Sequence, residues 1–89
     1  MPDRKMFRYA VPVDDQPHTI ALTHGPVAVA SPELAWVEFW AEHTEGATQA
    51  DRTFQVFGTG QPLPEGAKWI GTCPRVSGIV WHLYEVTDA

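Results

Sequence analysis

Alternation of apolar and polar residues dominates the chain and predicts β-strands. Along residues 6–13 every second side chain is apolar, namely Phe7, Tyr9, Val11 and Val13. This spacing of two is typical of a half-buried strand, and Pro12, which lacks an amide hydrogen, favours a place at a sheet edge. The same alternation predicts further short strands at 18–22, 27–30, 52–57, 68–73 and 78–86.

The segment from residue 31 to residue 46 allows two interpretations. Ser31 and Pro32 suit an N-cap and a first helical position, and Gly46 is placed to end such a helix. Residues 34–40, however, are dense in aromatic and β-branched side chains, which favour strands. They also follow the strand at 27–30 after a short proline-containing break, as the second arm of a hairpin would. We therefore predict a strand here.

Residues 78–86 give the clearest strand, and both of its faces are largely apolar. The two sets of side chains are Ile79, Trp81 and Leu83, and Val80, Tyr84 and Val86. An antiparallel strand beside solvent normally alternates, so we expect this one to be covered on both sides. In so small a domain the second cover can be another subunit, which predicts a homo-oligomer.

Together these segments predict a mainly β fold with six or seven short antiparallel strands in a sandwich or partly open barrel. The alternative is an α+β fold with one helix at about 32–45. The chain has 89 residues, which suits one domain, and we assign residues 1–89 to it. Residues 1–5 and 87–89 are expected to be flexible.

Composition and charge narrow the classes of partner. The net charge is −5, and of the six basic residues only Arg4, Lys5 and Arg8 cluster. Nucleic-acid binding normally needs a concentrated basic face, so we expect no nucleic-acid partner. No apolar run approaches the roughly 18 residues that a membrane-spanning helix needs, and no signal peptide is recognisable. We therefore expect a cytoplasmic protein without a membrane partner.

Residues that carry catalytic or metal chemistry are few and scattered. Cys73 is the one cysteine, which excludes a disulfide within the chain and a cysteine-based zinc site. His18, His24 and His43 have irregular spacings. His82 has no recognisable nucleophile or carboxylate partner, so a histidine hydrogen-bonded across strands is favoured over a general base. We expect no enzymatic activity, no cofactor and no metal.

Gly58, Thr59 and Gly60 directly follow a predicted strand, which suggests a phosphate cradle built from backbone N–H groups. The Lys-Ser/Thr ending of a P-loop is missing, as are the third glycine and the following helix of a dinucleotide fingerprint. The other interpretation is a turn whose glycines adopt positive φ and which Pro62 and Pro64 stiffen.

Two of the four tryptophans offer a candidate recognition surface. On a strand, Trp36 and Trp40 share one face with Glu38 between them. An ionised carboxylate is costly to bury unpaired, so we expect this face to be exposed, or covered by a partner that supplies a cation or donor. Exposed tryptophans are typical of recognition surfaces. The alternative is that one indole caps the edge of the core while Glu38 reaches water.

Three groups of residues carry a resemblance to a known family. They are Phe7-Arg8-Tyr9 with Pro12-Val13; Arg52-Thr53-Phe54 followed by Gly58-Thr59-Gly60-Gln61-Pro62-Leu63-Pro64; and Trp69-Ile70-Gly71-Thr72 followed by Val80-Trp81-His82-Leu83-Tyr84-Glu85. In this order they resemble small uncharacterised proteins encoded in phages and prophages, chiefly of actinobacteria. That family often has histidine where this chain has Gln61, so no metal-binding or proton-transfer role of that imidazole is carried over.

The resemblance implies a phage or prophage gene, of the kind whose products often modulate the host or its defences, and it supports the hairpin. The leading hypothesis is a non-catalytic accessory protein in the host cytoplasm that binds itself and a host protein. The alternatives are an anti-defence sponge that sequesters a small nucleotide-like signal, and a minor virion or assembly component. The candidate binding residues are Trp36, Glu38, Trp40, Gly58, Thr59, Gly60, Gln61, Trp69 and His82.

Overall fold

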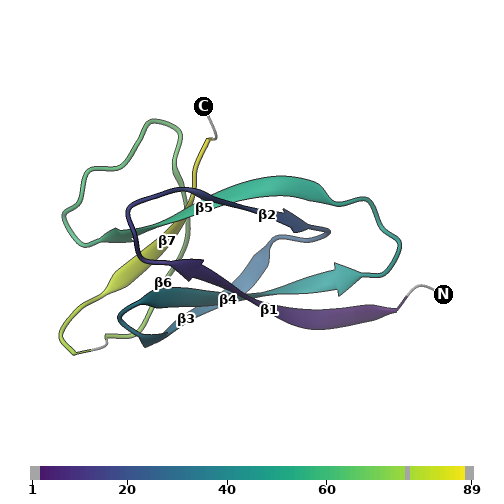
Figure 1. Ribbon diagram of the computed structural model, residues 1–89, viewed down its shortest axis with the longest axis horizontal. Helices are drawn as coiled ribbons and strands as arrows, with labels where there is room; N and C mark the ends of the chain where they lie inside the picture. The colour runs from purple at the N-terminus through teal and green to yellow at the C-terminus, as the bar shows by residue number, and fades with distance from the viewer. Residues whose placement is uncertain (1–2, 76, 88–89) are drawn as a thin grey trace.

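The computed structural model describes residues 3–75 and 77–87, and seven β-strands account for most of them (Figure 1). The described residues form no helix that is long and apolar enough to cross a membrane. The strands are β1 (Arg4–Pro12), β2 (His18–Leu22), β3 (Pro26–Glu33), β4 (Trp36–Thr44), β5 (Ala50–Gly58), β6 (Lys68–Thr72) and β7 (Trp81–Glu85).

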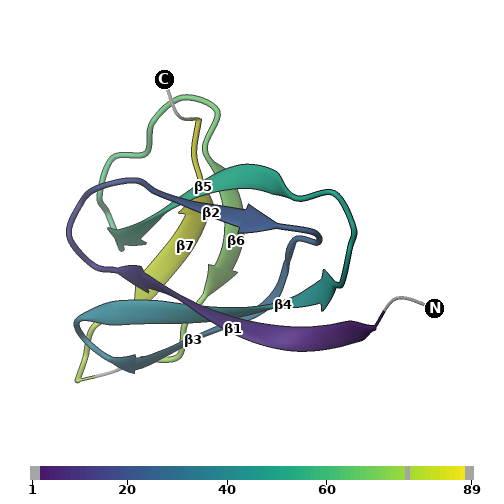
Figure 2. The same cartoon turned by 45° about the vertical axis from the view of Figure 1, so that its right-hand side comes forward.

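The strands form two antiparallel sheets that pack as a sandwich. One sheet has the order β1-β4-β3 and the other has the order β2-β5-β7-β6. In Figure 2, β1, β4 and β3 lie below β2 and β5. The predicted mainly β fold is confirmed as a sandwich, because the two sheets stay separate and do not close on one another.

The segment with two interpretations is a strand, and the predicted alternative of a helix at 32–45 is wrong. It forms β4, which pairs with β3 in a hairpin. The predicted break was misplaced, however, since Ser31 belongs to β3 and the chain turns at residues 34–35. Ser31 Oγ lies 2.7 Å from the carbonyl of Glu33 and 3.3 Å from that of Trp36. The serine hydroxyl therefore binds the hairpin backbone instead of capping a helix.

The core lies between the sheets and is built around aromatic rings. The ring centroids of Phe39 in β4 and Phe54 in β5 are 5.0 Å apart, and both side chains are fully buried. Cys73 joins this cluster with 3% exposure, and burial raises the pKa of its thiol. The remaining members are Val11, Leu22, Val37, Ala41, Val56 and Leu83.

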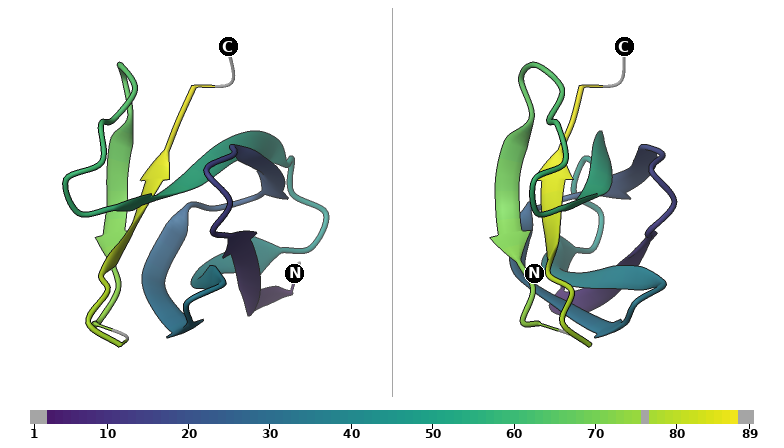
Figure 3. Two further views of the ribbon diagram at one scale, coloured as in Figure 1. Left: turned by 60° about the vertical axis from the view of Figure 1, so that its left-hand side comes forward. Right: turned by 90° about the vertical axis from the view of Figure 1, so that its left-hand side faces the viewer.

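The two sheets approach closely where β6 packs against β3 (Figure 3). A Cβ atom added at Gly71 would lie 2.6 Å from Cγ2 of Val29, a separation that packed carbon atoms do not reach. Val29 is β-branched and has little freedom to move aside. Only glycine therefore fits at position 71 without a shift of one sheet relative to the other.

The edges and ends of the sheets refine the predictions. β1 lies at an edge of its sheet, in keeping with Pro12. Arg4 and Lys5, within the segment 1–5 that is expected to be flexible, pair with Thr44 and His43 in β4. Residues 1–2 and 88–89 lie outside the described residues.

Candidate functional site

The predicted binding residues gather on two separate surfaces of the sandwich. We call the outer surface of the β1-β4-β3 sheet face A, and that of the β2-β5-β7-β6 sheet face B. Trp36, Glu38 and Trp40 lie together on face A, because the alternate side chains of β4 are buried in the core. The other six candidates, Gly58, Thr59, Gly60, Gln61, Trp69 and His82, lie on face B or on the loop beside it.

Face A presents two indoles that have different neighbours on the adjacent strands. Trp36 is 43% exposed and Trp40 is half-buried. Beside Trp40 and Glu38 on β3 stand Ala28 and Ala30, in direct register with them. On the other side of Trp40 stands Arg8 of β1, whereas Trp36 lies between Pro12 of β1 and Glu33 of β3. Both indoles thus project from the same side of β4, with Glu38 between them.

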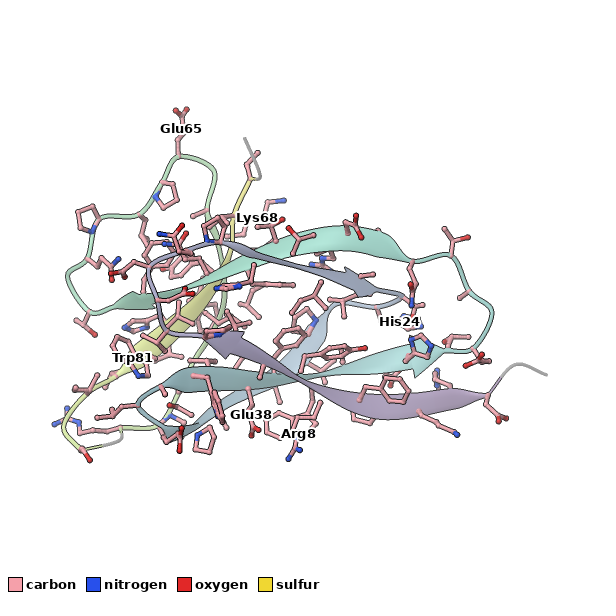
Figure 4. All side chains as sticks on the ribbon, in the orientation of Figure 1. Arg8, His24, Glu38, Glu65, Lys68 and Trp81 are labelled. Atoms are coloured by element: carbon pink, nitrogen blue, oxygen red, sulfur yellow. The ribbon has the colours of Figure 1, made fainter. Side chains whose placement is uncertain are left out.

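The cation near Glu38 comes from the chain itself. Arg8 Nε of β1 lies 3.6 Å from Glu38 Oε2, and Arg4 Nε lies at the same distance from Glu42 Oε1. Figure 4 shows Arg8 and Glu38 projecting from the same side of the molecule. Sequence reasoning missed this pairing, although Arg8 stands between Phe7 and Tyr9, which alternation turns toward the core. Arg8 remains 66% exposed, so its pairing with Glu38 is weak.

The loop after β5 starts with a tight turn from Gly58 to Gln61. The Gln61 N–H donates to the Gly58 carbonyl over 3.1 Å, and Gly60 has a φ of 88°, as a type II turn requires. The Gly58 N–H donates to Gln61 Oε1 over 3.0 Å, and Gln61 Nε2 donates to Asp15 Oδ1 over 3.3 Å. Two of the amides that a phosphate cradle would use are therefore occupied. The loop therefore begins with a turn, in which Gly60 adopts the expected positive φ and Gly58 does not.

A chain of hydrogen bonds crosses face B from β6 to the loop. Trp69 Nε1 donates to Thr72 Oγ1 over 2.9 Å, and Thr72 Oγ1 lies 2.9 Å from His82 Nδ1. His82 Nε2 lies 2.8 Å from Thr59 Oγ1. The predicted structural histidine is therefore hydrogen-bonded across strands and also to the loop. Sequence reasoning named Trp69, His82 and Thr59 but missed Thr72, which joins them.

The protons of this chain can be assigned from its fixed end. The indole N–H of Trp69 has no choice but to donate, so Thr72 Oγ1 accepts it. If each hydroxyl accepts once and donates once, the Thr72 hydroxyl donates to His82 Nδ1, and His82 Nε2–H donates to Thr59 Oγ1. This assignment uses a neutral imidazole. It leaves the hydrogen of the Thr59 hydroxyl available to another acceptor.

A cavity of about 140 Å³ adjoins Thr59 and His82. Its apolar wall includes Phe57, which is 3% exposed, and Tyr84, whose ring meets that of Phe57 edge-on at 5.6 Å and 88°. Leu63 of the loop lines the same cavity. The loop thus provides part of the second cover that the apolar faces of β7 predicted.

A bidentate ion pair ties β5 to β7 at the other end of this sheet. Arg52 Nε and Nη2 donate to the two carboxylate oxygens of Glu85 over 2.8 and 2.7 Å. These hydrogen bonds hold the pKa of Glu85 below its usual range and raise the pKa of Arg52. The guanidinium carbon also lies 5.9 Å from the ring centroid of Phe54. The pair is a structural clamp that the sequence did not reveal.

The remaining histidines lie apart. His18 Nε2 is 2.9 Å from Asp14 Oδ1, and this hydrogen bond lowers the pKa of Asp14. His24 Nε2 is 2.8 Å from a threonine hydroxyl, and His43 stacks on Phe7 with ring centroids 4.7 Å apart. Within residues 3–75 and 77–87, no three His, Cys, Asp or Glu side chains form a group that could hold a metal ion.

These observations define a small two-sheet β-sandwich domain with an exposed tryptophan surface on one side and a hydrogen-bonded cavity on the other. Residues 2–89 match the family described as "Domain of unknown function (DUF7352)", and the chain belongs to this family. No curated protein and no solved structure matches the chain.

Proposed function

We propose that this chain is a non-catalytic binding protein that engages a partner protein through face A. The proposal is carried by one observation: Trp36 and Trp40 stand outward on a strand whose intervening side chains, Val37 and Phe39, are fully buried. The core therefore anchors the backbone that carries both indoles before any partner arrives. Rigid presentation of large side chains lowers the entropy that binding must overcome.

The chemistry of face A resembles the chemistry of binding hot spots. Tryptophan and arginine are enriched among the residues that dominate protein interfaces, and both are present here. Met6, 53% exposed, extends the apolar surface along β1 beside Glu42. The charged pairs at 3.6 Å are loose enough to change partners when another protein supplies a better geometry.

Features of face B support a non-catalytic role. Both ring nitrogens of His82 are occupied by threonine hydroxyls, of Thr59 and Thr72. A general base needs one free ring nitrogen facing a substrate and, usually, a carboxylate that orients the ring. The described surroundings of His82 provide hydroxyl groups in place of that carboxylate.

The partner proposed is a bacterial host protein, with self-association through the same surface. This proposal follows from the phage or prophage origin that the sequence resemblance implies. On the same basis we propose that the protein acts in the host cytoplasm. The nucleotide sponge and the virion component stay predictions. Against a phosphorylated ligand, the residues that line the cavity on face B include no lysine or arginine.

A matched pair of tryptophan variants tests the role of face A. Trp40→Ala removes an indole from face A, whereas Trp69→Ala removes one from face B that is 61% exposed. Tagged wild type and both variants are incubated with host lysate, and captured proteins are quantified by mass spectrometry. We expect Trp40→Ala to lose a captured protein by about 30-fold or more, the scale of a hot spot, while Trp69→Ala retains it. Equal capture by Trp40→Ala would exclude face A.

Self-association is tested separately by light scattering over a concentration series. We expect the wild type to exceed the monomer mass and Trp36→Ala to return to it, with unchanged circular dichroism. A wild type that stays monomeric at the highest concentration would remove the homo-oligomer from the proposal and leave the host-protein partner to the capture experiment.

A further inference from the structure

We propose that the cavity on face B binds a small uncharged ring that carries a carbonyl group, with the Thr59 hydroxyl as its hydrogen-bond donor. This site is distinct from face A and does not depend on the protein partner proposed above.

The size of the cavity sets the size of the ligand. A volume of about 140 Å³ corresponds to roughly five waters at about 30 Å³ each. This suits a molecule of one or two rings and is below the usual size of a drug pocket, about 300–1,000 Å³. A ligand with so few atoms binds weakly, so we expect dissociation constants of about 0.1–1 mM.

The walls of the cavity favour a planar apolar body. Phe57 is buried beneath the cavity, and the edge-to-face contact with Tyr84 fixes the orientation of both rings. Leu63 closes the side that faces the loop. Aromatic walls stack on planar rings or meet their edges with little cost in side-chain entropy.

The electrostatics favour an uncharged ligand. No lysine, arginine, aspartate or glutamate is among the residues that line the cavity. Beyond the lining, the carboxylate of Asp15 accepts a hydrogen bond from Gln61. The lining residues themselves offer a phosphate no lysine or arginine and an ammonium group no carboxylate; the nearby cation, Arg75, lines the adjoining hollow that shares Gly58 and Thr59 with this cavity. The recognised group is therefore neutral.

The hydrogen-bond chain decides which polar group the ligand presents. Only the first bond, from the Trp69 indole to Thr72, has a fixed direction; with the His82 tautomer assigned above, donation continues through Thr72 and His82 to Thr59. The Thr59 oxygen accepts from His82 and keeps its own hydrogen for an outside acceptor. A carbonyl oxygen is the matching neutral acceptor. Because the Thr59 hydroxyl already accepts one hydrogen bond, the hydrogen bond that it donates to the ligand is strengthened.

The site is tested by NMR titration with uracil and nicotinamide, two neutral rings that carry carbonyl groups. Uridine monophosphate and choline serve as the charged comparisons. We expect the amide resonances of Gly58, Thr59 and Gly60 to shift with uracil or nicotinamide and to saturate at millimolar concentration. We expect uridine monophosphate to bind no more tightly than uracil, and choline not to bind.

Variants of Thr59 test the donor. This side chain is exposed, so its replacement leaves folding intact. We expect Thr59→Val, which removes the hydroxyl at nearly constant shape, to weaken binding by about fivefold, the effect of one neutral hydrogen bond. Thr59→Ser keeps the hydroxyl and should bind like the wild type. Trp36→Ala on face A is the control and should leave the titration unchanged.

Several outcomes would overturn the proposal. They are an absence of shifts at about 5 mM of either neutral ring, several times the expected dissociation constant; uridine monophosphate binding tenfold more tightly than uracil; choline binding in their place; or Thr59→Val binding as well as the wild type. Each of these results leaves the face A experiments unaffected, since the variants that remove a face A indole, Trp36→Ala and Trp40→Ala, lie on the opposite sheet.

Discussion

Face A and face B each expose a tryptophan, but they hold its surroundings in different ways. Beside Trp36 and Trp40, polar contacts are ion pairs at 3.6 Å from arginines that remain largely in water. Beside Trp69, they are short hydrogen bonds of 2.8–2.9 Å that run through Thr72 and His82 into a loop. On face A the backbone is held by the core while the charged side chains can rearrange. On face B hydrogen bonds hold even the hydroxyl groups of the side chains.

This difference bears on the two kinds of binding that we propose for the two faces. A large partner contacts many residues at once, so a surface whose charges can rearrange tolerates its shape. A small ligand offers few contacts, so each of them must be in place beforehand. The exposure of a tryptophan alone therefore says less about the kind of partner it suits than does the freedom of the polar groups around it.

The largest expected effect concerns the packing that both faces share. Gly71→Ala places a methyl group against Val29 at 2.6 Å and should lower the free energy of unfolding by about 1–3 kcal/mol. This exceeds the gain of about 0.4–1 kcal/mol that alanine brings by restricting the unfolded chain. Urea denaturation measures the loss, and the double variant with Val29→Ala should recover part of it. Additive losses would show that the two sites do not touch.

The next effect is expected to differ between the two sheets. Glu85→Gln breaks the bidentate pair with Arg52 and should cost about 1–2 kcal/mol, a modest value because both side chains are partly solvated. It should shift amide resonances of face B more than those of face A. If both faces respond equally, the clamp supports the whole sandwich and the distinction between the sheets weakens.

The same pair predicts a pH dependence. The hydrogen bonds from Arg52 lower the pKa of folded Glu85 below its usual 4.5. Between the two pKa values the unfolded chain binds more protons, so stability rises with pH. The contribution is complete above about pH 4.5 and is lost as the pH falls through the lower, folded value. Urea denaturation between pH 7 and pH 3 should show this loss in the wild type, and Glu85→Gln should lack that part of it.

A smaller effect tests the fixed hydrogen bonds of face B. Thr72→Val removes the hydroxyl between Trp69 and His82 and should cost about 0.5–1.5 kcal/mol. The indole N–H resonance of Trp69 should move and exchange faster with solvent. Thr19→Val is the matched control, since it breaks a 2.8 Å hydroxyl contact with Thr53 elsewhere in the same sheet. If the Trp69 indole resonance moves equally in both variants, the series of hydrogen bonds from Trp69 through Thr72 to His82 would be refuted.

The smallest effect tests the adaptable charges of face A. Glu38→Gln should change the free energy of unfolding by less than about 0.5 kcal/mol, because its partner Arg8 is exposed and the pair is long. Glu42→Gln, which loosens the pair with Arg4, should behave alike. A loss above about 1 kcal/mol, larger than exposed pairs give, would mean that face A is held as firmly as face B.

The local sequence pattern predicted strands correctly where the alternation of apolar and polar residues follows the burial of their side chains. Residues 18–22 coincide with β2, and the aromatic and β-branched side chains after Trp36 outweighed the helix-start signals of Ser31 and Pro32. Alternation also placed Trp36, Glu38 and Trp40 on one side of a strand. These outcomes depend on neighbours along the chain, which a sequence displays directly.

The contacts of face B depend on register, which a sequence does not display. Trp69 and Thr72 are three residues apart and would point to opposite sides of a regular strand. A shift in register between Trp69 and Gly71 turns both toward the same surface. Thr72 then stands opposite His82. In the same way, the approach of Arg52 to Glu85 follows from the alignment of β5 with β7.

The burial of Cys73 gives the molecule an internal reporter. Its sulfur lies in the core with a raised pKa, so alkylating reagents reach a reactive thiolate only when the sandwich opens. Because the chain has one cysteine, the labelled fraction measured over time counts opening events in water without denaturant. Each substitution discussed above can thus be ranked by its labelling rate relative to the wild type, in water without denaturant.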